Sequence, residues 1–271
     1  MAINAPYWDS QLMIEDNQKP HILAIGDSWF WFPTNNLLNP IFKHFNSGKC
    51  ILVLGNNGAE AVEYVGKKYR DAIQSSLDAW AGSIEAVLIS GGGNDFAGLD
   101  DMFQIIRTRC EGFASVDECF NQAQPGRIFD EVGDAYRQLI DMILAAAPHA
   151  RIFIHNYDRA IPTGKGFAGL GNWLKGPMVS ARIGAPLHQG IVNRLLFEFT
   201  QRLKAQCARS SRVTFVDSAR IGDLARAEDI RGKGTLASTE WGDELHPKPR
   251  GFNKIVKTCW APAFAAAGLV P

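Results

Sequence analysis

The sequence predicts an α/β fold in which a parallel β-sheet carries helices on both faces. Three observations indicate this class: short apolar runs recur along the chain, amphipathic helical patterns separate them, and the spacing is typical of β-α-β units. Strands buried on both faces are apolar along their whole length, and right-handed crossovers place helices on either side of the sheet. We therefore expect a three-layer α/β/α sandwich.

Five short runs are expected to form the strands. Each is almost continuously apolar, and each is followed by Gly, Asn, Asp or Ser, which favour turns. In chain order these runs are His21–Ile25, Cys50–Leu54, Ile84–Ile89, Arg151–His155 and Arg212–Val216.

Helices are expected between these strands, where apolar residues recur every three or four positions. Such patterns cover 62–80, 132–146 and 187–203, and a last helix is expected over about 249–261. Each pattern is long enough to cover a sheet face, so these segments supply the outer layers of the sandwich.

Two longer segments, 96–127 and 157–186, interrupt the alternation directly after strands. Long insertions at strand ends are commonly functional, so we expect them to act as lid or substrate loops. Within the first, the apolar spacing from Leu99 to Cys110 favours a short helix, which could equally cover the edge of the sheet.

Charge and composition exclude several function classes. The 271 residues include 28 Lys and Arg against 28 Asp and Glu, so the formal net charge is zero. A dedicated nucleic-acid-binding protein needs an excess of cations to neutralise phosphates. No run approaches the roughly 18 to 20 apolar residues of a membrane span, and the first residues lack the pattern of a secretory signal. We expect a cytoplasmic protein with a small-molecule substrate.

The five cysteines allow two interpretations. They form no Cys-x-x-Cys pair, and their odd number leaves at least one thiol free. Reduced thiols suit the expected cytoplasmic location, whereas a Cys110–Cys119 disulfide would close one short loop.

Polar residues that suit acyl transfer follow several of the predicted strands. Ser28 follows the first strand, Gly58 and Asn94 follow the next two, and His246 lies near the C-terminus with Asp243 three residues before it. Ligands of open parallel sheets bind at the carboxyl edge, where we expect these residues to meet. Singly each residue has a structural explanation, such as a helix N-cap or an Asx turn. Together they supply a nucleophile, a general base with its orienting carboxylate, and oxyanion donors.

These residues lie in four sequence blocks that resemble those of the SGNH hydrolases, also called the GDSL esterase/lipase family. The blocks occur in the family's order: Gly26-Asp27-Ser28-Trp29, Gly58, Gly92-Gly93-Asn94-Asp95 and Asp243-Glu244-Leu245-His246. They extend over residues 26–246, which is nearly the whole chain. The resemblance implies a flavodoxin-like sheet with strand order 2-1-3-4-5 in a single domain over residues 1–271.

The resemblance also implies a role for each of these residues. By this resemblance the protein is expected to be a serine esterase, which is a carboxylesterase-like or lipase-like hydrolase. The catalytic triad would be Ser28, His246 and Asp243. The oxyanion hole would be formed by Ser28, Gly58 and Asn94. Two features depart from the family pattern. Trp29 follows the serine where a smaller aliphatic residue is usual, and the residues after Gly58 lack the usual small hydroxyl side chains.

Aromatic residues near the blocks are the candidate substrate contacts. Trp29 and Phe30 directly follow the nucleophile, Tyr157 follows the fourth strand, and Phe167 and Trp173 lie in the second long loop. These rings could form a wall for an acyl or aryl group, stack on a sugar, or simply pack beneath the rim of the sheet. We expect small to medium hydrophobic acyl or aryl esters as substrates.

Other functions would use the same residues, or part of them. The site could transfer the acyl group to an alcohol or deacetylate a carbohydrate, and a non-catalytic binding module would need only the aromatic loops. The pattern over residues 164–169 resembles a dinucleotide-binding motif but does not directly follow a strand, so we expect no nucleotide cofactor. No second His, Cys or Asp cluster accompanies Asp243 and His246 at ligand spacing, so no metal is expected.

Overall fold

The computed structural model describes residues 6–32, 35–45, 48–121, 125–167 and 171–269. Within these ranges five strands form one parallel sheet in the order β2-β1-β3-β4-β5, which confirms the predicted fold class and strand order. Every strand lies within two residues of its predicted bounds. The strands are β1 (Ile22–Gly26), β2 (Ile51–Gly55), β3 (Ala86–Ile89), β4 (Arg151–His155) and β5 (Val213–Val216).

The register of the strands brings their carboxyl ends to one edge of the sheet. Gly26 of β1 pairs with Gly55 of β2, Ile25 pairs with Ile89 of β3, and Ile89 pairs with Ile154 of β4. The residues that follow each strand are therefore neighbours, although the strands are far apart in the sequence. This edge carries the candidate site.

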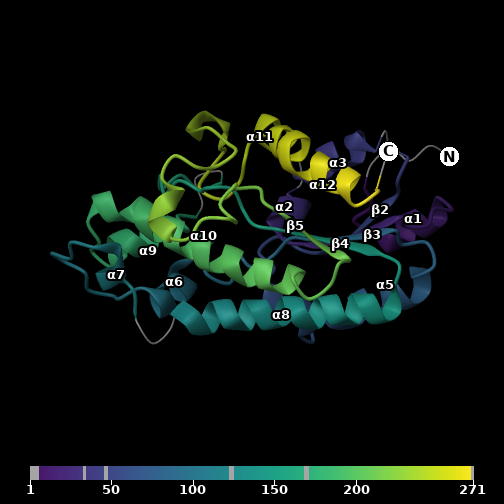
Figure 1. Ribbon diagram of the computed structural model, residues 1–271, viewed down its shortest axis with the longest axis horizontal. Helices are drawn as coiled ribbons and strands as arrows, with labels where there is room; N and C mark the ends of the chain where they lie inside the picture. The colour runs from purple at the N-terminus through teal and green to yellow at the C-terminus, as the bar shows by residue number, and fades with distance from the viewer. Residues whose placement is uncertain (1–5, 33–34, 46–47, 122–124, 168–170, 270–271) are drawn as a thin grey trace.

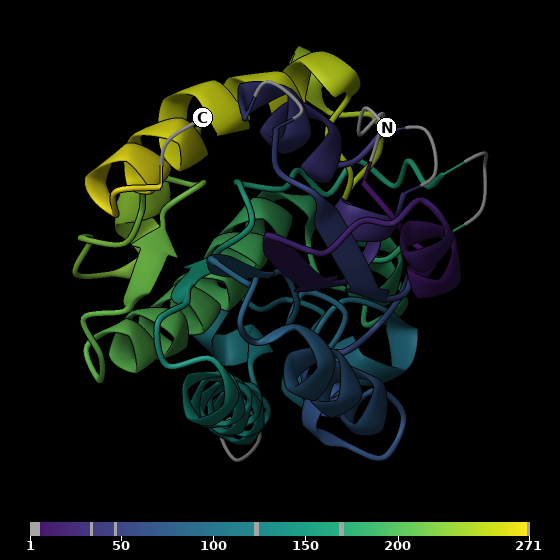
Figure 2. The same ribbon diagram turned by 90° about the vertical axis from the view of Figure 1, so that its right-hand side faces the viewer.

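Two helical layers enclose the sheet (Figures 1 and 2). One layer contains the long helices α8 and α10, drawn in teal and green, and the other contains the yellow C-terminal helices. The first layer consists of α4 (Ala61–Val65), α5 (Arg70–Trp80), α8 (Pro125–Ala146) and α10 (Ala185–Cys207), and the second of α3 (Leu38–His44), α11 (Pro249–Ile255), the π-helical turn η3 (Val256–Trp260) and α12 (Ala261–Ala266).

The helices differ from the prediction in several places, and α8 begins at Pro125 rather than at the expected 132. The helix expected over 62–80 is two helices, because Gly66 ends α4 with an extended backbone (φ −82°, ψ 172°). The last helix continues past 261 to Ala266 through a π-helical turn. Residues Ser28–Trp31, for which no helix was predicted, form the short helix α2. The remaining short elements are α1 (Ser10–Glu15), η1 (Ala227–Ile230) and η2 (Ser238–Glu240).

The two long insertions contain short helices. The insertion 96–127 contains α6 (Leu99–Ile105) and α7 (Val116–Cys119). Helix α6 ends before Cys110, where the predicted helix was expected to end. The next residue, Ile106, instead pairs in an isolated antiparallel bridge with Phe120, which directly follows α7. In 157–186 the helix is α9 (Lys175–Ser180). Residues 122–124 of the first insertion and 168–170 of the second, including the end of the 164–169 glycine pattern, lie outside the described residues.

All five cysteines are free thiols, so Cys110 and Cys119 form no disulfide in this structure. Among the residues that the structure describes, no helix is both long and apolar enough to span a bilayer.

Candidate active site

Ser28 lies at the point where β1 turns into α2, and it is the first residue of that helix. The Asp27 carboxylate caps the helix by accepting the Trp29 N–H at 3.0 Å. The turn is tight, since a Cβ atom on Gly26 would lie 2.4 Å from the Phe30 ring. The local sequence thus places the Ser28 hydroxyl at the carboxyl edge of the sheet.

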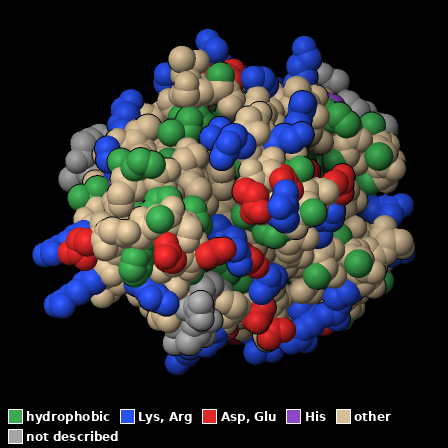
Figure 3. All heavy atoms as spheres, turned by 60° about the vertical axis from the view of Figure 1, so that its left-hand side comes forward, with side chains coloured by type: hydrophobic (Ala, Val, Ile, Leu, Met, Phe, Trp, Pro, Cys, Tyr) green, Lys and Arg blue, Asp and Glu red, His purple; other side chains and the backbone are tan. Residues whose placement is uncertain are grey.

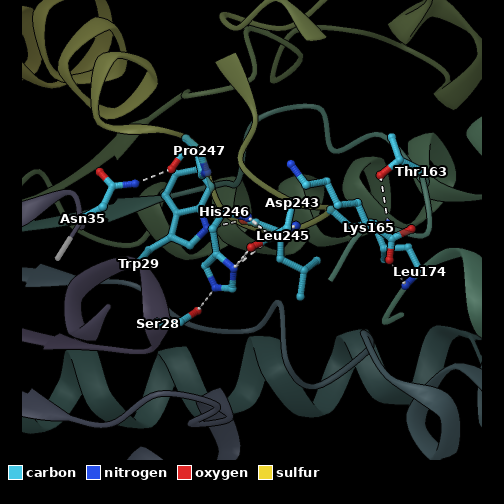
Figure 4. A network of polar contacts seen from close by, with 11 residues as sticks. Ser28, Trp29, Asn35, Thr163, Lys165, Leu174, Asp243, Leu245, His246 and Pro247 are labelled. Carbon is cyan, nitrogen blue, oxygen red and sulfur yellow. Dashed lines mark hydrogen bonds and ion pairs between the residues drawn. The ribbon is translucent and has the colours of Figure 1, made fainter. Parts of the chain in front are cut away.

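Ser28, His246 and Asp243 form a continuous hydrogen-bonded chain (Figure 4). His246 Nε2 lies 2.9 Å from Ser28 Oγ, and His246 Nδ1 lies 3.0 Å from both carboxylate oxygens of Asp243. The fold therefore brings together residues that are 218 positions apart, in the arrangement that activates a serine hydroxyl.

The surroundings of Asp243 keep its carboxylate ionised. Burial opposes ionisation, but the hydrogen bond and charge of His246 and the backbone N–H groups of Leu245 and His246 outweigh it, so the pKa of Asp243 is lowered. An ionised carboxylate can only accept, so the Nδ1 atom of His246 carries the proton. His246 Nε2 is then free to accept the proton of Ser28.

Gly58 and Asn94 line the same cavity as Ser28 and His246. Gly58 has φ +74°, and a Cβ atom there would have nothing within 4 Å, so it is the backbone conformation rather than space that favours glycine. Asn94 Nδ2 donates one hydrogen bond to Ala59 O at 2.9 Å, which leaves its second amide hydrogen available. In the described part of the chain, the backbone N–H groups of Ser28 and Gly58 have no acceptor.

Asp95, next to Asn94, holds the Gly58 loop against the β3 loop. Its carboxylate accepts the N–H groups of Ala61 at 2.8 Å and Val62 at 3.4 Å, at the start of α4. Burial raises the pKa of Asp95 to about 7, with the N–H group of Ala61 opposing and the Glu60 carboxylate adding to the rise. Two of the predicted oxyanion donors are therefore positioned by one contact between their loops.

A second polar network lies directly beneath Ser28. The Asp27 carboxylate, 2 % exposed, accepts the Tyr157 hydroxyl at 2.5 Å and the Ser90 hydroxyl at 2.8 Å. Tyr157 OH also accepts the Gly93 N–H at 3.3 Å. Burial raises the pKa of Asp27, while the hydrogen bonds from Tyr157 and Ser90 lower it. This network connects the turn that carries Ser28 to the turn that carries Asn94.

Trp29, which departs from the family pattern, connects the turn that carries Ser28 to the loop that carries His246. Its indole Nε1 donates to Leu245 O at 2.9 Å, and the side chain is 1 % exposed. Asn35 Nδ2 makes a parallel connection to Pro247 O at 2.6 Å (Figure 4). The two hydrogen bonds therefore hold the turn that carries Ser28 against the loop that carries His246.

The structure contradicts the predicted substrate contact of Phe30. Its side chain is fully buried, packs beneath Gly26 and against His155, and lines neither of the cavities at the site. The reason is helical geometry: α2 turns each successive side chain by about 100°, so Phe30 faces the core while Phe32 returns to the surface of the site. Phe32 stacks on His246 with the ring centroids 4.4 Å apart.

A narrow apolar cavity of about 40 Å³ opens beside Ser28. Tyr157 and Trp29, two of the candidate substrate contacts, form part of its wall, and the Tyr157 hydroxyl donates to Asp27. The other apolar residues that line it are Phe96, Ala97, Ala160, Leu174, Val192, Leu195, Leu196, Trp241 and Leu245.

A wider cavity of about 170 Å³ lies on the outer side of Ser28. Phe167 and Trp173, two of the predicted contacts, line it together with Phe32. Phe167 is 48 % exposed and meets Phe32 edge to face at 4.6 Å, and Trp173 meets His246 edge to face at 5.9 Å. Ser28 thus lies between a small inner cavity and a more open aromatic one.

Sequence reasoning missed Glu244, which attaches the 157–186 loop to the loop that carries His246. Its carboxylate is fully buried and accepts the N–H groups of Gly164 at 2.7 Å, Leu174 at 3.0 Å and Lys175 at 3.1 Å. The sequence feature that could have indicated this role is the position of Glu244 between Asp243 and His246. A carboxylate that is buried at such a position needs hydrogen-bond donors from the surrounding protein. Of the two insertions, 157–186 contributes more residues to the two cavities, whereas 96–127 contributes Phe96 and Ala97.

Comparison with known proteins identifies relatives by sequence pattern and by fold. The model of the GDSL-like lipase/acylhydrolase family matches residues 24–254. No curated protein matches the sequence. Similar solved structures include a candidate SGNH hydrolase from Slackia heliotrinireducens (TM-score 0.56, 13 % identity, 91 % of this chain and 100 % of that one) and an extracellular lipase from Streptomyces rimosus (TM-score 0.51, 17 % identity, 92 % and 99 %). Identities this low establish the shared fold alone.

Proposed function

The chain belongs to the GDSL-like lipase/acylhydrolase family, a family of esterase-type and lipase-type hydrolases, and we propose that it is a serine esterase for carboxylic esters of short acyl groups. The observation that carries the proposal is the hydrogen-bonded chain from Ser28 Oγ through His246 to Asp243, with distances of 2.9 and 3.0 Å. This hydrogen-bonded triad lies beside N–H donors of Ser28, Gly58 and Asn94 that have no acceptor, which supports an acyl-enzyme mechanism.

In the proposed mechanism, His246 Nε2 takes the hydroxyl proton as Ser28 Oγ attacks the ester carbonyl. The oxyanion accepts hydrogen bonds from the N–H groups of Ser28 and Gly58 and from the free amide hydrogen of Asn94. Protonated His246 then gives its proton to the leaving alcohol, and the same nitrogen activates the water that releases the acid. Asp243 stabilises the imidazolium throughout.

The size of the inner cavity favours short acyl groups. A cavity of about 40 Å³ leaves little free space beside Ser28, so it suits a short acyl group better than a long fatty acyl chain, which would need movement of the wall. The wall is apolar, which suits a hydrocarbon chain rather than a charged acyl group.

A series of p-nitrophenyl esters from acetate to decanoate tests the proposal. We expect kcat/KM to be highest at two to four carbons and to fall steeply beyond them. Ser28→Ala should lower kcat by about 10⁶-fold and Asp243→Asn by less than the loss of His246, because Asp243 acts through orientation. Ser75→Ala, on the exposed face of α5, is the matched control and should leave the rate unchanged. An S28A protein that retains the parent rate would refute the assignment.

Carbohydrate deacetylation is a second candidate, favoured by the small inner cavity and the aromatic outer one. An acetyl group fits about 40 Å³, and Phe32, Phe167 and Trp173 are the type of side chain on which sugar rings stack. Acetylated sugars assayed beside aryl acetates distinguish the leaving groups. Product analysis with added alcohol distinguishes hydrolysis from acyl transfer, and a fluorophosphonate probe that fails to label Ser28 would indicate a non-catalytic binding module.

A further inference from the structure

A second cavity lies behind the segment that walls the inner cavity of the active site. Asp158 and Ala160 line the inner cavity, whereas Arg159, between them, lines the second one. In the same way Val192 of α10 faces the first and Asn193 the second. The second cavity measures about 420 Å³ and is bounded by the start of α7, the first half of α10 and η1.

The two carboxylates that line this second cavity both form ion pairs. Asp117 pairs with Arg194 at 3.1 Å, and Arg194 also pairs with Glu198 at 2.7 Å. Glu228 pairs with Arg226 at 3.3 Å, and Arg226 also pairs with Asp229 at 3.1 Å. Figure 3 shows Lys and Arg side chains intermixed with Asp and Glu on this end of the molecule, as such pairing requires. Both acidic side chains of the cavity therefore have a cationic partner, whereas Arg159 and Arg231, which also line it, form no ion pair among the described residues.

Three donors of the cavity lack a protein acceptor. Across the described ranges, neither Arg159 nor Arg231 has a carboxylate within 4.0 Å, and the Nε atom of Arg159 is buried without any hydrogen-bond partner. Asn193 is 7 % exposed, and its Oδ1 accepts from Gln189 Nε2 at 3.1 Å, so its NH₂ group remains to donate. Leaving a buried donor of a charged group unsatisfied is unfavourable, and a ligand oxygen would remove that penalty.

We propose that this cavity binds a phosphate monoester with a small apolar body. Two guanidinium groups without carboxylates match an anion that carries about two negative charges, as a phosphate monoester does near neutral pH. The planar guanidinium donates two parallel hydrogen bonds to phosphate oxygens, and the Asn193 NH₂ group supplies a further donor. Pro186, Leu187 and Ala227 line the remaining space, where an apolar ester group is accommodated.

Isothermal titration with phenyl phosphate tests the proposal. We expect one equivalent to bind at millimolar concentration or below and to raise the melting temperature. Arg231→Gln and Arg159→Gln should each weaken binding by about tenfold or more, since each removes a charge-assisted pair of hydrogen bonds. Arg209→Gln, at an exposed ion pair with Asp141 beyond the end of α10, is the control and should bind as the parent does. Arg231 is exposed, so its variant remains informative if Arg159→Gln fails to fold.

Two further ligands separate the parts of the proposal. Inorganic phosphate should bind more weakly than phenyl phosphate, and benzoate should bind most weakly. If inorganic phosphate binds as tightly as phenyl phosphate, the claim that the cavity accommodates an apolar ester group is wrong. If benzoate binds more tightly than phenyl phosphate, the claim that the cavity prefers phosphate is wrong. If the parent protein does not bind phenyl phosphate at millimolar concentration, the proposed site is wrong. The same holds if Arg159→Gln, Arg231→Gln and the control Arg209→Gln all bind phenyl phosphate equally. These measurements are independent of esterase activity.

Discussion

Replacing Tyr157 by Phe tests whether the buried network beneath Ser28 supports catalysis. The substitution removes one hydroxyl and keeps the ring that packs against Trp29 and Phe199. Asp27 then loses its shortest hydrogen bond, at 2.5 Å, and the Gly93 N–H loses its acceptor. Any effect therefore arises from the polar network rather than from packing.

The loss should be larger than that of an ordinary buried hydroxyl. A hydrogen bond to a charged group contributes about 1.5–3 kcal/mol, against about 0.5–1.5 kcal/mol for a neutral pair. Tyr64→Phe is the matched control, because Tyr64 is also buried and its hydroxyl donates to the Ser90 carbonyl at 2.8 Å. We expect Tyr157→Phe to lower the free energy of unfolding by about 2 kcal/mol at neutral pH and Tyr64→Phe by about 1 kcal/mol.

The pH dependence of the Tyr157→Phe effect follows from Asp27. Burial raises the pKa of this carboxyl, and the Tyr157 hydrogen bond opposes the rise, so the variant has a still higher folded-state pKa. The folded variant therefore takes up its proton at a higher pH than the parent does. The extra destabilisation is fully present above both folded-state pKa values, shrinks as the pH falls through them, and is absent below them.

Urea denaturation between pH 4 and 8, with steady-state kinetics beside it, measures both consequences. Because Tyr157 holds the Gly93 N–H next to Asn94, we expect kcat to fall about tenfold, equivalent to about 1.4 kcal/mol, with little change in KM. The reasoning is refuted if Tyr157→Phe and Tyr64→Phe show the same pH-independent loss of stability and both retain the parent kcat.

Three further substitutions test other contacts. Trp29→Phe removes the hydrogen bond to Leu245 O. We expect the free energy of unfolding to fall by about 1 kcal/mol and kcat to fall severalfold. An unchanged kcat, measured where parent and variant are both fully folded, would exclude a role of this hydrogen bond in positioning. Glu244→Gln halves the acceptor capacity for three backbone amides, so hydrogen exchange at Leu174 should quicken; equal protection in parent and variant would contradict the anchoring role. Leu196→Ala should enlarge the inner cavity and raise the hexanoate-to-acetate ratio of kcat/KM, whereas an unchanged ratio would place the acyl group elsewhere.

Much of the site could be predicted because its residues occupy sequence positions with a topological meaning. Ser28 and Asn94 directly follow parallel strands, and parallel strands that share a register deliver such residues to one edge. His246 could be placed with them only through the order of the motif blocks, since no strand precedes it closely. The resulting distance of 2.9 Å to Ser28 agrees with that expectation.

The rings beside the nucleophile could not be assigned from the sequence. Trp29, Phe30 and Phe32 belong to one aromatic run, and their directions depend on the phase of the short helix that begins at Ser28. That helix forms because Asp27 caps it, and the cap in turn depends on distant donors at Ser90 and Tyr157. Local pattern therefore carries no information on which ring reaches the site.

The sequence by itself determined the layers of the fold, the strand bounds within two residues, and the residue types gathered at the carboxyl edge, because apolar periodicity and strand-end positions are local properties of the chain. Only the tertiary structure decided which groups touch. The buried carboxylates of Asp27 and Glu244 take donors from segments far away in the sequence, and the side chains that close the inner cavity to about 40 Å³ come from several separate elements. Such contacts depend on packing in three dimensions, which no single stretch of sequence encodes.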